Sequence, residues 1–273
     1  MSNTTAFIDE RQSILFDEVI ENGPFPIRFP RRHELDQDEE WCEVQVEGKW
    51  ERIRFHDYHE VYRIPGLYET IFYRTLRCNS PITVVSLLGD ILSENIFPAE
   101  HLNVLDVGAG NGMVGEALQH LGSRNIVGID IIPEAKEAAL RDRPWVYNDY
   151  LVADLTDLTP EQISKLEENA FNCLTVVAAL GFGDIQPAAF FKAYNFVRDN
   201  GWIAFNIKED FLQDDDASGF AKLTNLMTRR GILQIEAYKR YCHRLDITGG
   251  PLNYIAVVGR KKRSIPAQLL NEV

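Results

Sequence analysis

From about residue 80 onward, the chain alternates between short apolar runs and longer amphipathic stretches. The apolar runs cover residues 102–107, 125–129, 147–152, 173–180 and 202–207. Runs that are continuously apolar, rather than alternating, are typical of parallel strands that helices cover on both faces. With right-handed crossovers between them, these runs predict a doubly wound α/β sheet.

Two more apolar segments follow, at 233–243 and 252–258. The link Thr248-Gly249-Gly250-Pro251 between them is too short for a parallel crossover. We therefore expect a terminal antiparallel hairpin, so that the complete sheet has seven strands, most of them parallel.

The first 80 residues have a different pattern. Apolar positions between Ile8 and Val19 fit one face of a short helix, and residues 67–77 fit another. Between these segments, residues 41–46 and 50–55 alternate apolar and polar positions on either side of Gly48, as in a half-buried hairpin.

These pieces are too thin to fold alone, so we expect them to form a cap on the sheet. The predicted organisation is an N-terminal helix and hairpin cap or lid at 1–80, a core domain at 81–263 and a tail at 264–273. Length and composition agree, because 273 residues with 45% hydrophobic content can bury one sizeable core and an appended unit.

Charge and composition limit the classes of partner that the chain is expected to bind. The net charge of -13 leaves no surplus of cations to neutralise phosphates, so no nucleic-acid partner is expected. No apolar run reaches the roughly 18 residues of a membrane span, and the N-terminus is polar, so we expect a cytoplasmic protein without a membrane partner. The four cysteines form no Cys-x-x-Cys pair, and no metal site is assigned. Nothing in the sequence indicates an oligomeric state.

The strongest local motif is Asp106-Val107-Gly108-Ala109-Gly110-Asn111-Gly112, which follows the first core strand and opens a helix that Gly122 should end. Three residues without Cβ let a ligand approach the backbone amides at the helix N-terminus. The overlapping Gly110 to Gly115 also fits the dinucleotide pattern Gly-x-Gly-x-x-Gly. Asp106 favours a methionine-type ligand, because its carboxylate would bind an amino group and repel a pyrophosphate. A dinucleotide remains the alternative.

Two more acidic residues follow the next strands. Asp130 ends the second core strand, where a carboxylate can accept hydrogen bonds from both ribose hydroxyls. Asp154 follows the third, where it can accept from the exocyclic amine of an adenine. The alternative for Asp154 is a helix cap or a loop acid.

Over residues 81–263 the chain resembles the class I S-adenosylmethionine (SAM)-dependent methyltransferases. The glycine motif, Asp130 and Val152-Ala153-Asp154-Leu155 carry the resemblance, and the terminal hairpin is similar. The resemblance implies SAM as cofactor, bound by Asp106, Gly108, Gly110, Gly112, Asp130, Ile131, Asp154, Leu155 and Ala179. Residues 174–184 lack the Asp/Asn-Pro-Pro-Tyr type of motif found in many methyltransferases that act on nucleic acid bases or glutamine.

Candidates for catalysis are His56, Tyr58 and Asp184, with hairpin-end surface as the alternative for the histidine and a helix cap for Asp184. His56 and His59 form a His-x-x-His pair without a third ligand, which does not define a metal site. The substrate pocket is predicted to include His59, Tyr62, Tyr68, Phe182 and Lys208, with a packing face as the alternative for the tyrosines and a surface ion pair for Lys208.

The predicted function is therefore transfer of a methyl group from SAM to a small molecule that the sequence does not identify. Three alternatives stay open: a protein or peptide methyltransferase, an NAD-dependent oxidoreductase, and a SAM-binding module without catalysis.

Overall fold

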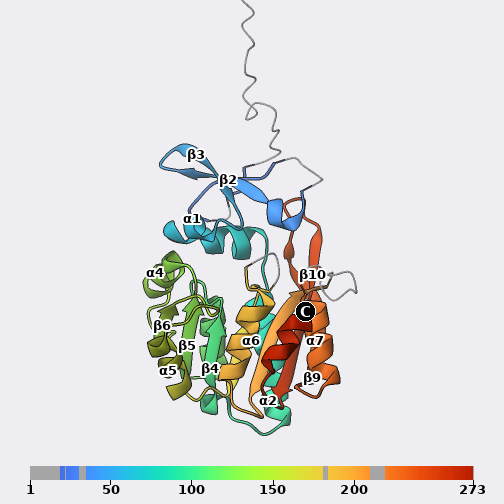
Figure 1. Ribbon diagram of the computed structural model, residues 1–273. Coiled ribbons are helices and arrows are strands. Elements are labelled where there is room, and N and C mark those ends of the chain that lie inside the picture. The colour runs from blue at the N-terminus through green and yellow to red at the C-terminus, as the bar shows by residue number, and fades with distance from the viewer. Residues whose placement is uncertain (1–18, 22, 31–34, 181–183, 210–218, 273) are drawn as a thin grey trace, which may run out of the picture.

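Two sheets organise the protein in the computed structural model (Figure 1), which describes residues 19–21, 23–30, 35–180, 184–209 and 219–272. The larger sheet lies in the core, and the smaller one lies beyond the carboxyl ends of the core strands. The helix predicted between Ile8 and Val19 falls, apart from Val19, outside the described residues. No helix in the described ranges is long and apolar enough to span a bilayer.

The larger sheet has seven strands in the order β6-β5-β4-β7-β8-β10-β9, which confirms the predicted fold class. The parallel strands are β4 (Asn103–Val107), β5 (Asn125–Asp130), β6 (Asp149–Val152), β7 (Cys173–Val176) and β8 (Trp202–Lys208). The antiparallel hairpin consists of β9 (Leu233–Leu245) and β10 (Pro251–Lys261). Strand β7 is shorter than the predicted 173–180, and Ala178 just beyond it has a φ of 57°, which a strand does not accommodate.

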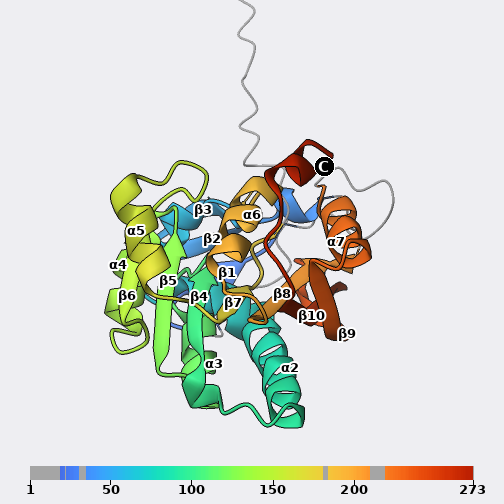
Figure 2. The ribbon, with the colours of Figure 1, turned by 60° about the horizontal axis from the view of Figure 1, so that its bottom comes forward.

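Helices cover both faces of this sheet (Figure 2). On one face lie α2 (Ser80–Glu94), α3 (Met113–Leu121) and α4 (Pro133–Asp142); on the other lie α5 (Pro160–Glu168), α6 (Pro187–Phe196) and α7 (Phe220–Arg229). Gly122, with a φ of 115°, ends α3 as predicted. Because side chains alternate along β4, Leu105 and Val107 pack toward α5 to α7 while Val104 packs toward α2 and α3.

The cap has its own apolar core. It contains β1 (Ile27–Arg28), β2 (Trp41–Val46) and β3 (Lys49–Arg54) in one antiparallel sheet, followed by α1 (Tyr58–Arg63) and a π-helix (Glu69–Thr75). The predicted hairpin is present, and the positive φ values of Glu47 and Gly48 fit a tight type I′ turn. Strand β1 and helix α1 were not predicted, and the helix expected at 67–77 is a π-helix over part of that range.

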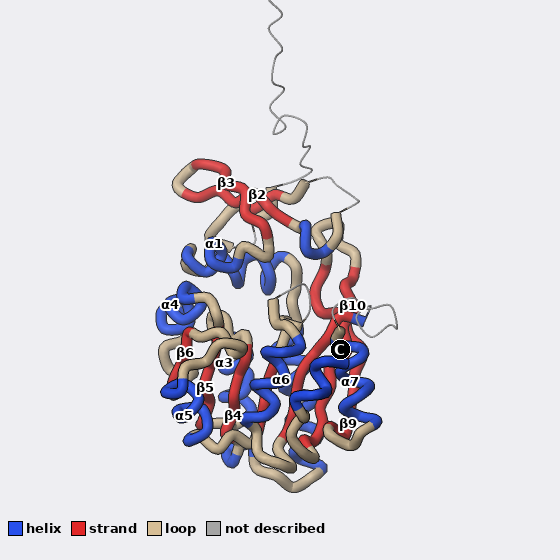
Figure 3. Tube along the Cα trace, viewed as in Figure 1, coloured by secondary structure: helices blue, strands red, loops and turns tan. Residues whose placement is uncertain are grey.

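Helix α1 and the β9–β10 hairpin both help to hold the cap over the carboxyl ends of the core strands. Helix α1 packs on α4, and the β9–β10 hairpin extends past the sheet to reach the cap (Figure 3). At that junction Arg244 forms an ion pair with Glu40, and both side chains are at most 4% exposed. The Leu245 N–H donates to the Leu76 carbonyl at 2.7 Å.

Candidate functional site

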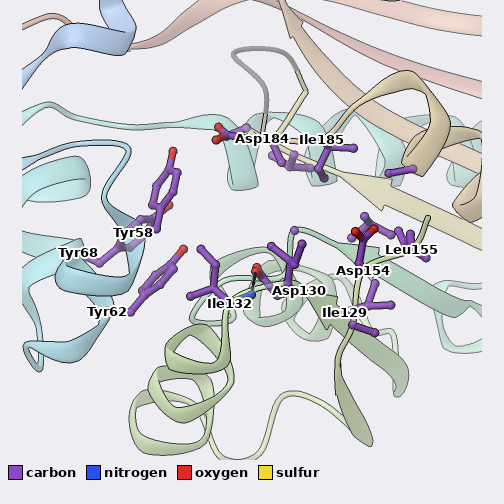
Figure 4. Close-up of a pocket in the computed structure, with 18 residues that line it drawn as sticks. Tyr58, Tyr62, Tyr68, Ile129, Asp130, Ile132, Asp154, Leu155, Asp184 and Ile185 are labelled. Carbon is purple, nitrogen blue, oxygen red and sulfur yellow. Dashed lines mark hydrogen bonds between the residues drawn. The ribbon is translucent and has the colours of Figure 1, made fainter. Parts of the chain in front are cut away.

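A cavity lies between the cap and the carboxyl ends of the core strands (Figure 4). We call it the edge cavity; it holds about 830 Å³ that no protein atom fills, part of it open to solvent. Tyr58, Tyr62 and Tyr68 line it from the cap. The core side is formed by Val107, Gly108, residues 129–132, 153–155 and 177–179, Asp184, Ile185 and Ala189.

The glycine turn brings backbone close to this cavity. Gly108, Gly110 and Gly112 have φ values of 67°, 52° and 92°, a region that side chains with a Cβ rarely adopt. Gly108 lines the edge cavity directly. A Cβ on Gly110 would lie 2.5 Å from the Tyr62 hydroxyl, so the cap rests on the turn itself.

A second group of contacts joins the cap to the same turn. The Glu69 Oε1 atom accepts hydrogen bonds from Asn111 Nδ2 and from Arg143 Nη1, each at 2.8 Å. Arg143 also donates to Glu116 Oε2 at 2.9 Å and to the Asn111 carbonyl at 3.2 Å. The position of the cap and the shape of the glycine turn are therefore coupled.

Asp130 lies at the end of β5, as predicted, and lines the edge cavity. Its Oδ2 accepts from the Gly110 N–H at 2.9 Å, and its Oδ1 accepts from the Ile132 N–H at 3.0 Å. Burial raises the pKa of this carboxyl, while the backbone hydrogen bonds oppose that rise. Each carboxylate oxygen has a second acceptor position, so Asp130 can still bind hydroxyl groups.

Asp154 lies across the cavity from the tyrosines, next to Leu155 (Figure 4). It is exposed, and its Oδ1 accepts from the Thr156 hydroxyl at 2.7 Å and the Thr156 N–H at 2.8 Å. These bonds lower the pKa of Asp154. Asp154 is therefore both an acid that hydrogen-bonds within its own loop, as in the alternative, and a residue that lines the edge cavity. Ile131 and Ala179 also line the cavity.

Asp106 lies behind the glycine turn, does not line the edge cavity and is only 1% exposed. Its Oδ1 accepts from the Thr175 hydroxyl at 2.6 Å, and its Oδ2 accepts from the Tyr147 hydroxyl at 2.7 Å. Burial raises the pKa of Asp106 to about 6, although both hydrogen bonds favour the charged form. In this arrangement the carboxylate supports the turn from the α2 and α3 side of the sheet.

The cap side of the cavity is an aromatic wall. The ring of Tyr62 lies 6.0 Å from that of Tyr58 and 5.0 Å from that of Tyr68, centroid to centroid. Burial raises the pKa of all three phenols, so they are neutral at physiological pH. They can exclude water and present ring faces to a positively charged ligand.

The three predicted catalytic candidates lie near one another. His56 Nδ1 is 3.5 Å from Asp184 Oδ2, and the His56 ring lies 5.7 Å from the Tyr58 ring. His56 comes from the loop after β3 and Asp184 from the loop after β7, so this pair crosses from the cap to the core. The structure thus brings the three candidates together where the cap meets the core.

Behind this pair lies a second, smaller space, which we call the inner chamber. It holds about 520 Å³ outside the protein atoms and shares Tyr58, Tyr68, Ala178, Ala179 and Asp184 with the edge cavity. Its remaining walls come from the cap, from Leu180 in the loop after β7, and from the β9–β10 hairpin. The cap contributes Gln37, Phe55, His56, Phe72 and Cys78, and the hairpin contributes His243, Arg244 and Tyr254.

Several predicted residues lie elsewhere. The side chain of His59 is 59% exposed and pairs with Glu60 at 3.6 Å, so the prediction that His59 lines the pocket has no support in either cavity lining. Lys208 at the end of β8 lines neither cavity, and Phe182 lies outside the described residues. Over the described ranges, no group of three or more His, Cys, Asp or Glu residues is placed to hold a metal ion.

Sequence reasoning did not assign Tyr147, Thr175 or Gln37. Tyr147 and Thr175 are recognisable only as partners of Asp106, and both are distant from it in the chain. Gln37 donates to the Tyr254 hydroxyl at 2.9 Å, across 217 positions of sequence. Local patterns carry no signal for such long-range pairs.

Comparison with known proteins adds independent findings. A family model described as "Methyltransferase domain" matches residues 105–205. The N-methyltransferase NodS of Bradyrhizobium japonicum, solved with S-adenosyl-L-homocysteine, is similar in fold, with a TM-score of 0.51 and 12% identity, covering 77% of this chain and 98% of that one. A Thermoplasma acidophilum protein aligns with a TM-score of 0.47 and 17% identity over 66% of this chain and 88% of its own.

A putative RNA methyltransferase of Pyrococcus horikoshii also aligns, with a TM-score of 0.47 and 11% identity over 66% of this chain and 82% of its own. No curated protein matches the sequence.

Proposed function

We propose, given that this chain belongs to the class I SAM-dependent methyltransferases, that it methylates a small molecule held under the cap. Methyl transfer is therefore preferred to the hypothesis of an NAD-dependent oxidoreductase. What remains to be identified is the acceptor, and the relation between the two cavities supports a small one.

The edge cavity fits the cofactor. Asp130 offers carboxylate oxygens for ribose hydroxyls, and Asp154 is placed beyond it for the exocyclic amine of adenine. Ile131 and Leu155 provide apolar surface for the base. The missing side chain at Gly108 leaves room for a ligand to approach the backbone of the turn.

Asp106 has a supporting part in this proposal. Its two hydrogen bonds connect β7 and Tyr147 to the strand that carries the glycine turn. Tyr147 also contacts the Ala109 carbonyl at 3.3 Å, inside the turn. The carboxylate therefore acts on the cofactor by positioning the turn and by its negative charge beneath it.

When bound, SAM would supply an electrophilic methyl group, with its sulfur as the leaving group that keeps the electron pair when the acceptor's oxygen or nitrogen bonds to the methyl carbon. The protein has to align the acceptor and exclude water. The tyrosine wall excludes water on the cap side. The imidazole of His56 receives the acceptor's proton, and Asp184 Oδ2, 3.5 Å from Nδ1, stabilises the resulting cation.

The observation that carries the proposal is the shared wall of the two cavities. Tyr58 and Asp184 line both of them, so the two spaces adjoin, and an acceptor in the inner chamber would meet the methyl group beside these side chains. The walls of the chamber come from the cap and the core hairpin together, which suits a small molecule better than a polymer.

The test uses SAM with an isotopically labelled methyl group and an extract of the organism that encodes the chain. After incubation, the label is measured separately in the small-molecule filtrate, the protein fraction and the nucleic acid fraction. We expect label in the filtrate, and its loss with Asp130→Asn. Label in protein would support the peptide alternative, and none in any fraction would support a module without catalysis.

Isothermal titration with S-adenosylhomocysteine tests the cofactor site independently of turnover. Heat of binding is expected for the wild-type protein and for the control variant Asp157→Asn. This variant makes the same Asp-to-Asn change as Asp130→Asn, but at an exposed residue in the loop after β6. No heat at millimolar ligand would contradict the assignment of the edge cavity.

A further inference from the structure

We propose that the inner chamber selects a flat, uncharged aromatic acceptor that carries an O–H or N–H donor, and that Gln37 accepts a hydrogen bond from that donor. This inference rests on the proposed function, because it names the class of molecule that the methyltransferase would modify.

Gln37 provides the first observation. Its Nε2 donates to the Tyr254 hydroxyl at 2.9 Å, so Oε1 is the amide atom left to accept from a ligand. Its Oε1 is buried and has no hydrogen-bond partner among the residues that the structure describes. A buried acceptor without a partner costs on the order of 1–3 kcal/mol, and a ligand that donates to it would recover that cost. Because Gln37 lines the inner chamber, the chamber prefers a ligand with a donor at this end.

The charge of the chamber provides the second observation. Arg244 is the one lysine or arginine among the described residues that line it, and Glu40 already neutralises that guanidinium in a buried ion pair. Burial lowers the pKa of His243 to about 3, so this imidazole is neutral at physiological pH. The remaining carboxylate in the lining belongs to Asp184. Apart from His56, whose Nδ1 lies 3.5 Å from Asp184 Oδ2, a carboxylate or phosphate on the ligand would therefore meet no available cation, and it would face the Asp184 carboxylate.

The shape of the walls provides the third observation. The His243 ring lies 4.2 Å from the Tyr254 ring at an angle of 35°, and Phe55 and Phe72 pack edge to face with centroids 5.4 Å apart. These rings face the chamber from the hairpin and from the cap. Aromatic walls of this kind favour a planar ring as the ligand.

Together these features orient the acceptor. Its donor group points toward Gln37, and its reacting atom points toward the wall that Tyr58 and Asp184 share with the edge cavity. A compound with one hydroxyl can therefore test recognition by Gln37 in a binding measurement, without being methylated.

The test measures binding of three compounds on one bicyclic frame, each titrated into protein saturated with S-adenosylhomocysteine. The compounds are quinolin-3-ol, which has a donor; quinoline, which has none; and quinoline-3-carboxylate, which is an anion. We expect quinolin-3-ol to bind at least tenfold more tightly than quinoline, and the carboxylate to bind most weakly. Equal affinities, or a preference for the carboxylate, would overturn the inference with wild-type protein alone.

Two variants sharpen the result. Gln37→Met removes the acceptor at similar length and should reduce the preference for quinolin-3-ol over quinoline toward one. Gln45→Met, a glutamine of strand β2 whose side chain forms only an exposed contact with the Gly48 carbonyl, should leave the preference unchanged. An unchanged preference in Gln37→Met would contradict the role of this residue.

The same titrations separate the two levels of the proposal. Binding of S-adenosylhomocysteine is measured first in every protein. If the wild type does not bind it, the proposed function fails; if it binds but the three compounds do not rank as stated, the inference about the chamber fails while the cofactor site stands.

Discussion

Gly110→Ala would put a methyl group against the hydroxyl of Tyr62. Its effect on the free energy of unfolding therefore tests whether the cap contacts the glycine turn. The added Cβ would lie 2.5 Å from the hydroxyl oxygen and 3.3 Å from Cζ. Real Cβ atoms do not approach other heavy atoms to 2.5 Å, so the turn or Tyr62 must shift. Tyr62 is buried against α4 and between two other tyrosines, which limits its movement.

The expected cost has two parts. The φ of 52° at residue 110 disfavours any Cβ by about 1–2 kcal/mol, and crowding in a packed site adds about 1–3 kcal/mol. Gly48 separates these parts, because its φ is 79° and nothing lies within 4 Å of its added Cβ. Gly48→Ala should therefore show only the backbone cost, about 1–2 kcal/mol.

A double-mutant cycle isolates the contact. Tyr62→Phe removes the hydroxyl and, alone, should cost about 0.5–1.5 kcal/mol for its lost side-chain hydrogen bond with Tyr68. In Gly110→Ala/Tyr62→Phe the closest atom is gone, so the double variant should be more stable than the sum of the single changes predicts, by about 1 kcal/mol. Urea denaturation monitored by tryptophan fluorescence gives the four free energies of unfolding.

Additive effects, with a coupling energy near zero, would refute the reasoning. They would mean that the Tyr62 hydroxyl does not rest on the glycine turn in solution. The cap would then not be closed over the edge cavity as described here.

Three further outcomes are expected. Asp130→Asn should weaken S-adenosylhomocysteine binding by about ten- to a hundredfold, since charge-assisted hydrogen bonds contribute about 1.5–3 kcal/mol, whereas Asp157→Asn should not; equal affinities by calorimetry would argue against a ribose site at Asp130. The pKa of Asp106 is raised from 3.8 to about 6, so its contribution to stability is present below pH 4 and is lost as the pH rises through 6. Relative to Asp106→Asn, the free energy of unfolding of the wild type should fall by about 3 kcal/mol over this pH range. Urea denaturation at several pH values measures it, and the same pH dependence in both proteins would exclude the effect. Glu40→Gln should destabilise the protein by about 3–5 kcal/mol by leaving Arg244 buried and unpaired, and Arg240→Ala, in an exposed pair with Glu209, by far less; similar thermal midpoints for both would contradict a buried clamp between cap and hairpin.

The core fold was predictable because its signals are local and repeated. Continuous apolar runs identified the five parallel strands, the short Gly-rich link identified the antiparallel hairpin, and Gly122 identified the end of α3. The cap was harder. Its hairpin follows period-two alternation, but β1 is two residues long and α1 six, which is too short for a period to show.

The site was predictable at the level of motifs and not of contacts. Asp130 and Gly108 line the edge cavity because strand ends in a parallel sheet meet at one edge. Asp106 faces a direction that depends on the partners across the sheet, Thr175 and Tyr147, which no local pattern identifies. The pair His56 and Asp184 joins residues far apart in the chain, so only the docked cap brings them together. The roles assigned to these residues remain predictions.

A crystal structure of the wild-type protein with S-adenosylhomocysteine tests the central claim most directly. The account predicts the ribose hydroxyls on the Asp130 carboxylate, the adenine beside Ile131 and Leu155, and the sulfur directed at the wall formed by Tyr58 and Asp184. A sulfur atom turned away from that wall, or a nucleoside bound outside the edge cavity, would contradict it.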